Sequence, residues 1–186
     1  DKLGGLTFKI SPTSFFQVNP LQTEGLYNKA IEYAGLTGKE TVLDVYCGIG
    51  TIALLMAAKA ERVVGFEVSA ESVRDAELNA KANKITNAQF ISGRAGDVLP
   101  KLVQQGIRPD VVVVDPPRQG VEKFALQAIV DIQPKKIVYI SCDPATMARD
   151  LKFLAERSFK LQEVQPVDMF PQTSHVESVA LLVRGY

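Results

Sequence analysis

The chain has 186 residues, of which 46% are apolar, and its 21 basic and 21 acidic side chains give a formal net charge of zero. This length suits one domain with a well-buried core, and the balanced charge excludes an overall basic field as the source of nucleic-acid affinity, which would need a local patch. Only two cysteines, no signal-peptide pattern and no apolar stretch of about 18 residues favour a cytoplasmic location and no membrane.

The first residues alternate like a strand. In "DKLGGLTFKISPTSFFQVN" the apolar side chains of Leu6, Phe8 and Ile10 fall on one side. We expect residues 1–19 to be an opening segment that leads in from a missing N-terminal part, with the folded domain over residues 20–186. The next stretch, "NPLQTEGLYNKAIEYAGL", has a proline near its start and apolar residues at helical spacing, which predicts an amphipathic helix.

From Thr41 onward, short β-branched runs alternate with segments of helical periodicity. The strand-like runs are "TVLDVYC", "RVVGFEV", "AQFIS", "DVVVVD" and "KIVYIS". Such alternation predicts an α/β fold with a mostly parallel sheet of seven strands and helices on both faces. The last two runs, "FKLQEVQPVDMF" and "VESVALLVR", are joined by a polar loop without a helix, which predicts a closing antiparallel hairpin.

A glycine turn follows the first of these strands. In "LDVYCGIGTIALLMA", Asp44 ends the strand and Gly48 and Gly50 lie in the turn before a helix. Glycines there let a ligand approach the main chain and the helix N-terminus. Glu67 ends the next strand, where an acid typically meets the ribose hydroxyls of a nucleoside cofactor. Because an acid before the glycines suits a cationic cofactor, Asp44 favours S-adenosylmethionine over a dinucleotide. The glycine loop by itself does not exclude a nicotinamide-dependent enzyme.

Two further strand-like runs end in candidate functional residues, Asp115 and Cys142. Asp115 in "VVVVDPPRQG" precedes two prolines that make a rigid loop. Amino-methylating enzymes often carry an aromatic residue in the place that Arg118 takes here. Cys142 lies in "SCDP", where Asp143 is placed to cap a helix, and a thiol outside a helix N-terminus has its thiolate favoured. The alternative for Cys142 is a thiol packed at a strand end.

The end of the chain adds a candidate base. Glu177 begins the last strand-like run, and the alternative for it is a solvated edge residue. His175, the only histidine, suits proton transfer but is more often a hydrogen-bonding support in a loop. Cys47 is interpreted as part of the wall beside the glycine turn.

With "FFQVNP", "LDVYCGIG", "DPPRQG", "SCDPATMARDL" and "HVES" in this order, essentially the whole chain resembles the catalytic domain of the RNA (uracil-5-)-methyltransferase family. The resemblance implies a Rossmann-like class I methyltransferase fold, S-adenosyl-L-methionine as cofactor and no metal. It implies Cys142 as the nucleophile and Glu177 as the base. The cofactor contacts, including the glycine turn, are then expected at Gln17, Tyr46, Gly48, Glu67 and Asp115.

The resemblance also implies RNA as the partner. Asp143 stands where the motif often has asparagine, and by analogy this variant indicates 23S ribosomal RNA, with much of the RNA binding supplied by N-terminal domains outside this sequence. A tRNA uracil-5 methyltransferase is the nearest alternative. A methyltransferase of exocyclic amines, which would not use Cys142, a cofactor-binding module without chemistry and a nicotinamide oxidoreductase stay open. A cytosine-5 enzyme fits poorly, because its cysteine would stand where Arg118 follows Pro117.

Overall fold

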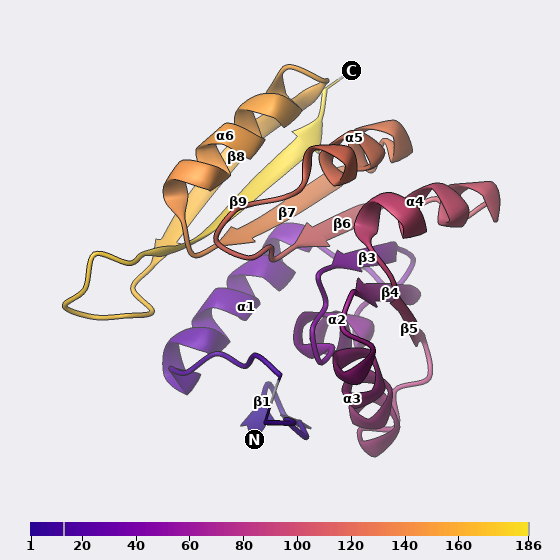
Figure 1. The fold of residues 1–186 in the computed structure, drawn as a ribbon, viewed down its shortest axis with the longest axis vertical. Coiled ribbons are helices and arrows are strands. Elements are labelled where there is room, and N and C mark those ends of the chain that lie inside the picture. Colours follow the sequence, from indigo (N-terminus) through magenta and orange to yellow (C-terminus); the bar gives the residue numbers. More distant parts are fainter. Residues whose placement is uncertain (13, 186) are drawn as a thin grey trace.

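Strands and helices alternate through most of the chain in the computed structural model, which describes residues 1–12 and 14–185 (Figure 1). The strands are β1 (Lys2–Leu3), β2 (Leu6–Thr7), β3 (Thr41–Val45), β4 (Arg62–Glu67), β5 (Ala88–Ser92), β6 (Val111–Val114), β7 (Lys136–Ser141), β8 (Phe159–Val167) and β9 (Glu177–Arg184). The helices are α1 (Pro20–Ala34), α2 (Thr51–Ala57), α3 (Ala70–Ala82), α4 (Ala95–Gln104), α5 (Lys123–Ile132) and α6 (Pro144–Ala155). The predicted α/β fold is confirmed.

The main sheet has seven strands in the order β5-β4-β3-β6-β7-β9-β8. Strands β3 to β7 run parallel, and β9 runs antiparallel between β7 and β8, so the predicted closing hairpin is confirmed. Strand order reverses between β3 and β6, because β3 leads to β4 on one side and β6 leads to β7 on the other. Ligands of open α/β sheets bind at the carboxyl ends of the strands beside such a reversal.

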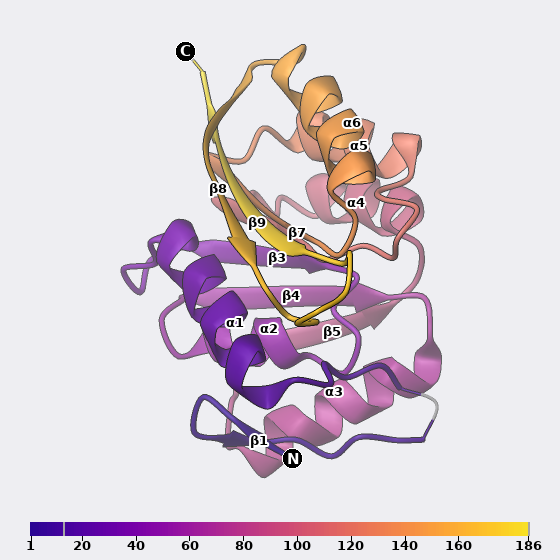
Figure 2. The same ribbon diagram turned by 90° about the vertical axis from the view of Figure 1, so that its left-hand side faces the viewer.

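Helices cover both faces of the sheet, with α1, α2 and α3 on one side and α4, α5 and α6 on the other (Figure 2). Strand β6 shows why its sequence is an unbroken valine run. Val111 and Val113 pack in the core under α1 to α3, whereas Val112 and Val114 pack in the core under α4 to α6. Helix α4 is less evident from the sequence, because a proline stands in its interior.

The opening segment is held by one face of α3. The side-chain oxygens of Asn83, Asn79 and Asp75 accept hydrogen bonds from the backbone N–H groups of Thr7, Lys9 and Ser11 at 2.9, 2.7 and 3.2 Å. The continuous strand predicted for this segment is therefore wrong. The chain forms only the short β1–β2 hairpin and then runs extended along α3, because helix side chains rather than a neighbouring strand take its backbone donors.

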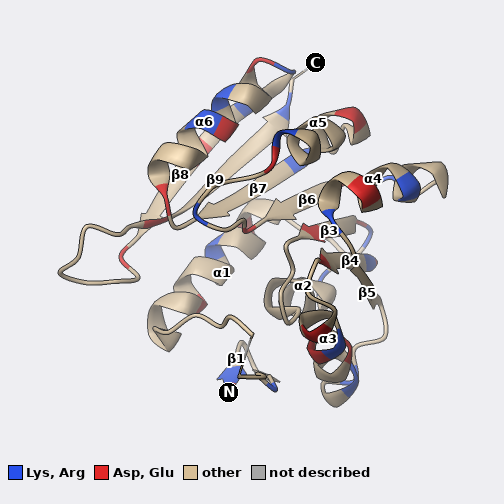
Figure 3. Cartoon of the chain, viewed as in Figure 1, with Lys and Arg blue, Asp and Glu red and all other residues tan. Residues whose placement is uncertain are grey.

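Charged residues are spread over the molecule. Figure 3 shows Lys and Arg on β1, α1, α3, α4 and α6 rather than gathered on one element. Within residues 1–12 and 14–185, no helix combines the length and the apolar character that a bilayer crossing requires. The zero net charge of the sequence therefore corresponds to a mixed surface, and affinity for a polyanion would require a local patch.

Candidate active site

The carboxyl edge of the sheet brings the strand-end acids together. Val45 pairs with Val114, so the segments after β3 and β6 leave the sheet side by side. The backbone N–H of Asp115 donates to the carbonyl of Val45 at 3.4 Å, which joins the start of the DPPR loop to the start of the glycine turn. Asp44 lies one position back on β3 and is 1% exposed. Both aspartates thus lie at the point where strand order reverses.

Cys142 and Glu177 are neighbours through the antiparallel pairing of β7 with β9. Ser141 pairs with Ser178, so the next residue on each strand places Cys142 beside Glu177. Cys142 is half-buried, whereas Glu177 is 3% exposed and its Oε2 has no hydrogen-bond partner among the described residues. The interpretation of Glu177 as a solvated edge residue is therefore wrong, because β8 covers β9 on its outer side.

The glycine turn has a left-handed backbone at three positions. Tyr46, Gly48 and Gly50 all have positive φ, at 71°, 53° and 83°. A Cβ at Gly50 would lie 2.9 Å from the ring of Phe90, so a side chain is excluded there, whereas a Cβ at Gly48 would meet open space. The backbone at Gly48 is therefore accessible to a ligand, and α2 begins directly after the turn.

Asp44 is buried and Asp115 is half-buried at this edge, and both acids favour a bound cation. Burial raises the pKa of Asp44 to about 8, and the nearby carboxyl groups of Asp115 and Glu67 add to the rise. Burial also raises the pKa of Asp115 to about 7, with a further contribution from Glu177. Neither carboxylate oxygen of Asp44 has a hydrogen-bond partner within the described residues. Acids in this state gain from a positively charged ligand, which fits a cofactor that carries an ammonium and a sulfonium.

Gln17 lies at the same edge, directly before α1. Its side chain is 6% exposed and its Oε1 has no partner in the part of the chain that the structure describes. Asn19 fixes this segment, since its Oδ1 caps α1 and its Nδ2 donates to the carbonyl of Met169 at 3.1 Å in the loop before β9. The sequence interpretation did not identify Asn19, although an asparagine before a proline is a helix-start signal.

Tyr27 on α1 is a second buried polar residue that the sequence interpretation missed. Burial raises its pKa well above the ordinary value, and Asp115, Asp44 and Glu177 raise it further, whereas a hydrogen bond with Gln17 opposes the rise. Its phenol therefore lies among the acids of the site. Helical spacing alone identified it only as part of a buried face.

The helix N-terminus was expected to favour the thiolate of Cys142, but the structure raises the pKa of this thiol. Asp143 caps α6 as predicted, and its Oδ1 accepts hydrogen bonds from the N–H groups of Ala145 and Thr146, both at 2.9 Å. The helix N-terminus is therefore occupied by a carboxylate rather than by the thiol. Burial raises the pKa of Cys142, Glu177 adds to this, and only the guanidinium of Arg118 and a backbone hydrogen bond oppose it.

The remaining expected residues take varied positions. Glu67 ends β4 and accepts a hydrogen bond from the N–H of Ser69 at 3.0 Å. Tyr46 is half-buried and packs against the core under α4 to α6.

His175 is exposed and makes an edge contact with the ring of Phe170 at 6.3 Å, while Cys47 is buried in the wall of the turn. No group of three potential metal ligands occurs in residues 1–12 and 14–185.

Asp44→Asn tests the electrostatics of this edge. The pKa of Asp44 in the folded protein is about 8, above its ordinary value of 3.8, so the folded state binds more protons than the unfolded state between these values. Stability is therefore lost as the pH rises through this range. We expect the cofactor-free variant to exceed the parent in free energy of unfolding by up to about 5 kcal/mol at about pH 8 and to match it within about 1 kcal/mol at about pH 4.

Urea unfolding at both pH values measures this difference. Asp131→Asn, which changes an exposed acid on α5, is the matched control and should show no pH-dependent gain. A difference between Asp44→Asn and the parent that is independent of pH would contradict the prediction.

Three comparisons place the chain among known proteins. Residues 4–185 match the family model described as tRNA (uracil-5-)-methyltransferase. Relatives named as uncharacterized RNA methyltransferases occur in Caldanaerobacter subterraneus, with 58% identity over 99% of this chain and 41% of the relative, and in Clostridium acetobutylicum, with 54% identity over 99% of this chain and 40% of the relative. The chain thus spans about 40% of the length of these curated relatives.

A solved structure is similar over nearly the whole chain. The tRNA (uracil-54, C5)-methyltransferase of Pyrococcus abyssi, in complex with S-adenosyl-L-homocysteine, superimposes with a TM-score of 0.84 and 33% identity. The match covers 98% of this chain and 43% of that one.

Proposed function

The chain belongs to the tRNA (uracil-5-)-methyltransferase family, and from this premise we propose that it methylates carbon 5 of a uridine in RNA with S-adenosyl-L-methionine as the methyl donor. The observation that carries this proposal is the adjacency of Cys142 and Glu177 across the β7–β9 pair, at the edge where the buried acids favour a cation. Residues 20–186 form the catalytic domain in this proposal, and residues 1–19 are its entry segment.

The reaction explains why a thiol and a carboxylate are both needed. Carbon 5 of uracil is too weak a nucleophile to take a methyl group directly. Cys142 adds as a thiolate to carbon 6, and the ring becomes an enolate whose carbon 5 is nucleophilic. The bound cofactor supplies the electrophilic methyl group. Glu177 then removes the proton from carbon 5, and the C–S bond breaks to release the thiolate and the 5-methyluridine.

The cofactor pocket uses the residues around the point of strand reversal. Gln17, Tyr46, Gly48, Glu67 and Asp115 hold the cofactor in this proposal. The unpartnered Oε1 of Gln17 and the open backbone face at Gly48 support the assignment. Glu67 suits the ribose hydroxyls, and the raised pKa of Asp115 supports a role beside the cation.

The substrate is RNA, in a cytoplasmic setting, and the uridine must leave its stack for its ring carbons to be reached. We propose 23S ribosomal RNA as the target, on the evidence of Asp143 in the "SCDP" motif. The second candidate is tRNA, because the Pyrococcus abyssi protein of known structure acts on uracil 54 of tRNA. Much of the RNA affinity belongs to the other domains, since the chain spans about 40% of its relatives and carries no net charge.

A trapped adduct tests the chemistry. RNA that carries 5-fluorouridine leaves fluorine where the base would remove a proton, so the methylated ring stays attached to the protein. We expect peptide mass spectrometry of the intact enzyme with S-adenosyl-L-methionine and this RNA to find the adduct on Cys142. Fluorinated 23S ribosomal RNA and tRNA transcripts, compared in parallel, identify the target. Methylation of ordinary RNA without any adduct would favour an exocyclic-amine methyltransferase instead.

A further inference from the structure

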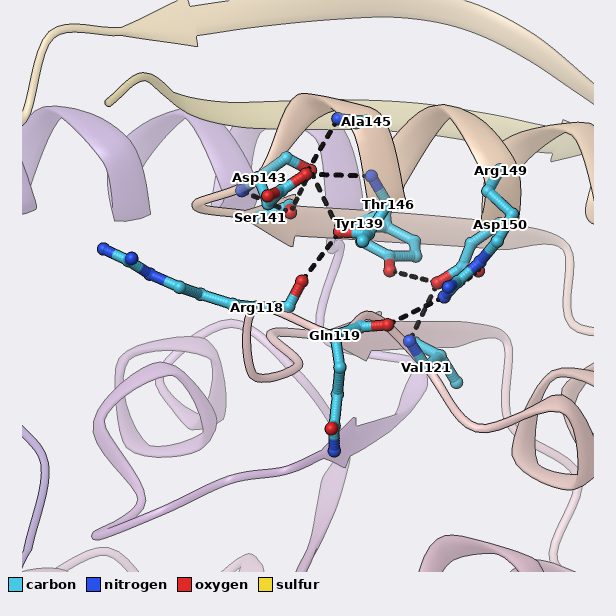
Figure 4. Close-up of polar contacts among 10 residues, drawn as sticks. All are labelled: Arg118, Gln119, Val121, Tyr139, Ser141, Asp143, Ala145, Thr146, Arg149 and Asp150. Atoms are coloured by element: carbon cyan, nitrogen blue, oxygen red, sulfur yellow. Dashed lines mark hydrogen bonds and ion pairs between the residues drawn. The ribbon is translucent and has the colours of Figure 1, made fainter. Parts of the chain in front are cut away.

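One face of α6 contacts the loop that follows β6. In "TMARD" the side chains of Thr146, Arg149 and Asp150 are spaced by three and four residues, so they lie on one side of the helix. Each bonds a backbone group of that loop, as Figure 4 shows. The bonds run from Thr146 Oγ1 to Arg118 O at 3.0 Å, from Arg149 Nη2 to Gln119 O at 2.8 Å, and from Val121 N to Asp150 Oδ2 at 2.8 Å.

Asp150 is the centre of this network. It is 1% exposed, yet its Oδ2 also accepts a hydrogen bond from the hydroxyl of Tyr139 at 2.7 Å, and its Oδ1 accepts from Arg149 Nε at 2.8 Å. Tyr139 belongs to β7, the strand that leads into Cys142. A buried carboxylate is costly unless it is fully paired, and the partners of Asp150 come from α6, β7 and the loop, so this side chain ties the three segments together.

The loop backbone lies directly on these side chains. Gly120 has a φ of 79°, and a Cβ there would lie 2.5 Å from Arg149 Nη2 and 2.6 Å from Asp150 Oδ2. Beside these contacts the loop and α6 border a cavity of about 520 Å³, whose lining includes Gly120, Val121, Arg149 and Asp150. The loop is therefore not close-packed against α6 along the whole of this contact, and its hydrogen bonds with Thr146, Arg149 and Asp150 hold its backbone in place.

Arg118 is the loop residue whose charge acts on Cys142 and Glu177. Its guanidinium extends away from the bonded backbone in Figure 4, and it lowers the pKa of both Cys142 and Glu177. The other charged groups that act on the thiol are Glu177 and Asp115, which both raise its pKa. Arg118 is thus the only side chain among these that favours the thiolate.

We propose that Thr146, Arg149 and Asp150 form a clamp that positions Arg118 against Cys142 and Glu177. The clamp residues are positioning residues, since they bind the loop backbone and leave the reacting atoms to others. This inference rests on the proposed function for its biological meaning, but its physical content concerns the thiol alone. A thiol whose positive neighbour is held in place is deprotonated, and therefore nucleophilic, at lower pH.

Alkylation of Cys142 by iodoacetamide, followed by peptide mass spectrometry from about pH 6 to pH 10, measures this in the intact protein. Thr146→Val keeps the side-chain shape and removes the bond to Arg118, and Asp150→Asn keeps the volume and removes the buried charge. We expect both variants to shift the alkylation profile to higher pH and to slow the reaction at neutral pH by about threefold or more. Arg118→Met should do the same.

A double-variant comparison shows whether the clamp acts through Arg118. In the Arg118→Met background, Thr146→Val and Asp150→Asn should cause no further shift. Gln127→Ala, which removes an exposed hydrogen bond to Asp131 on α5, is the control and should leave the profile unchanged. Lower stability in urea with an unshifted profile, or additive shifts in the double variants, would overturn the proposal. Because no RNA is involved, these outcomes are independent of whether the protein methylates uracil.

Discussion

Cys142→Ala is expected to abolish RNA methylation, with a loss of about 10⁴-fold or more, because carbon 5 of uracil cannot be activated without the thiolate at carbon 6. The variant should fold normally, since Cys142 is only half-buried at the end of β7 and its neighbour Asp143 still caps α6. Transfer of labelled methyl groups to RNA measures the activity. Calorimetric titration with S-adenosyl-L-homocysteine checks that the cofactor site is retained.

The control for this experiment is His175→Ala. His175 is exposed in the loop before β9, and we expect its removal to change the methylation rate by less than about threefold. If Cys142→Ala methylates RNA at a rate near that of the parent, the cysteine is a packing residue. The site would then act on an amine, whose lone pair attacks the methyl group without covalent help.

Glu177→Gln is expected to stop the reaction at a different point. The amide cannot take the proton from carbon 5, so turnover should fall by about 10² to 10⁴-fold while the thiol still adds to the ring. A methylated covalent adduct should therefore accumulate with ordinary, unfluorinated RNA. Since Glu177 raises the pKa of Cys142, its neutralisation should also favour the thiolate and speed the formation of the adduct.

Denaturing gel electrophoresis and the mass of the Cys142 peptide measure this adduct. The double variant Cys142→Ala with Glu177→Gln provides the control and should form none. An active Glu177→Gln variant that shows no adduct would mean that another group removes the proton.

Local sequence patterns determined much of the fold. The valine run of β6, the alternation of strands with helices and the hairpin of β8 and β9 follow from hydrophobic periodicity, which is encoded within a few consecutive residues. The glycine turn and the Asp143 cap are equally local, because glycine permits a positive φ and an aspartate before a helix accepts hydrogen bonds from its first N–H groups. The opening segment escaped this reasoning, because α3, which lies far away in the sequence, supplies its hydrogen-bond partners.

The sequence by itself therefore determined which chemical groups lie at strand ends, among them Asp44, Asp115, Cys142 and Glu177. Only the tertiary structure decided which of them are neighbours and what charge they carry. The antiparallel register of β7 with β9 places Glu177 beside the thiol, and burial at the sheet edge raises the pKa of Asp44 to about 8. The physical reason is that hydrophobic periodicity and turn preferences are local, whereas desolvation and charge–charge interactions depend on segments brought together by packing.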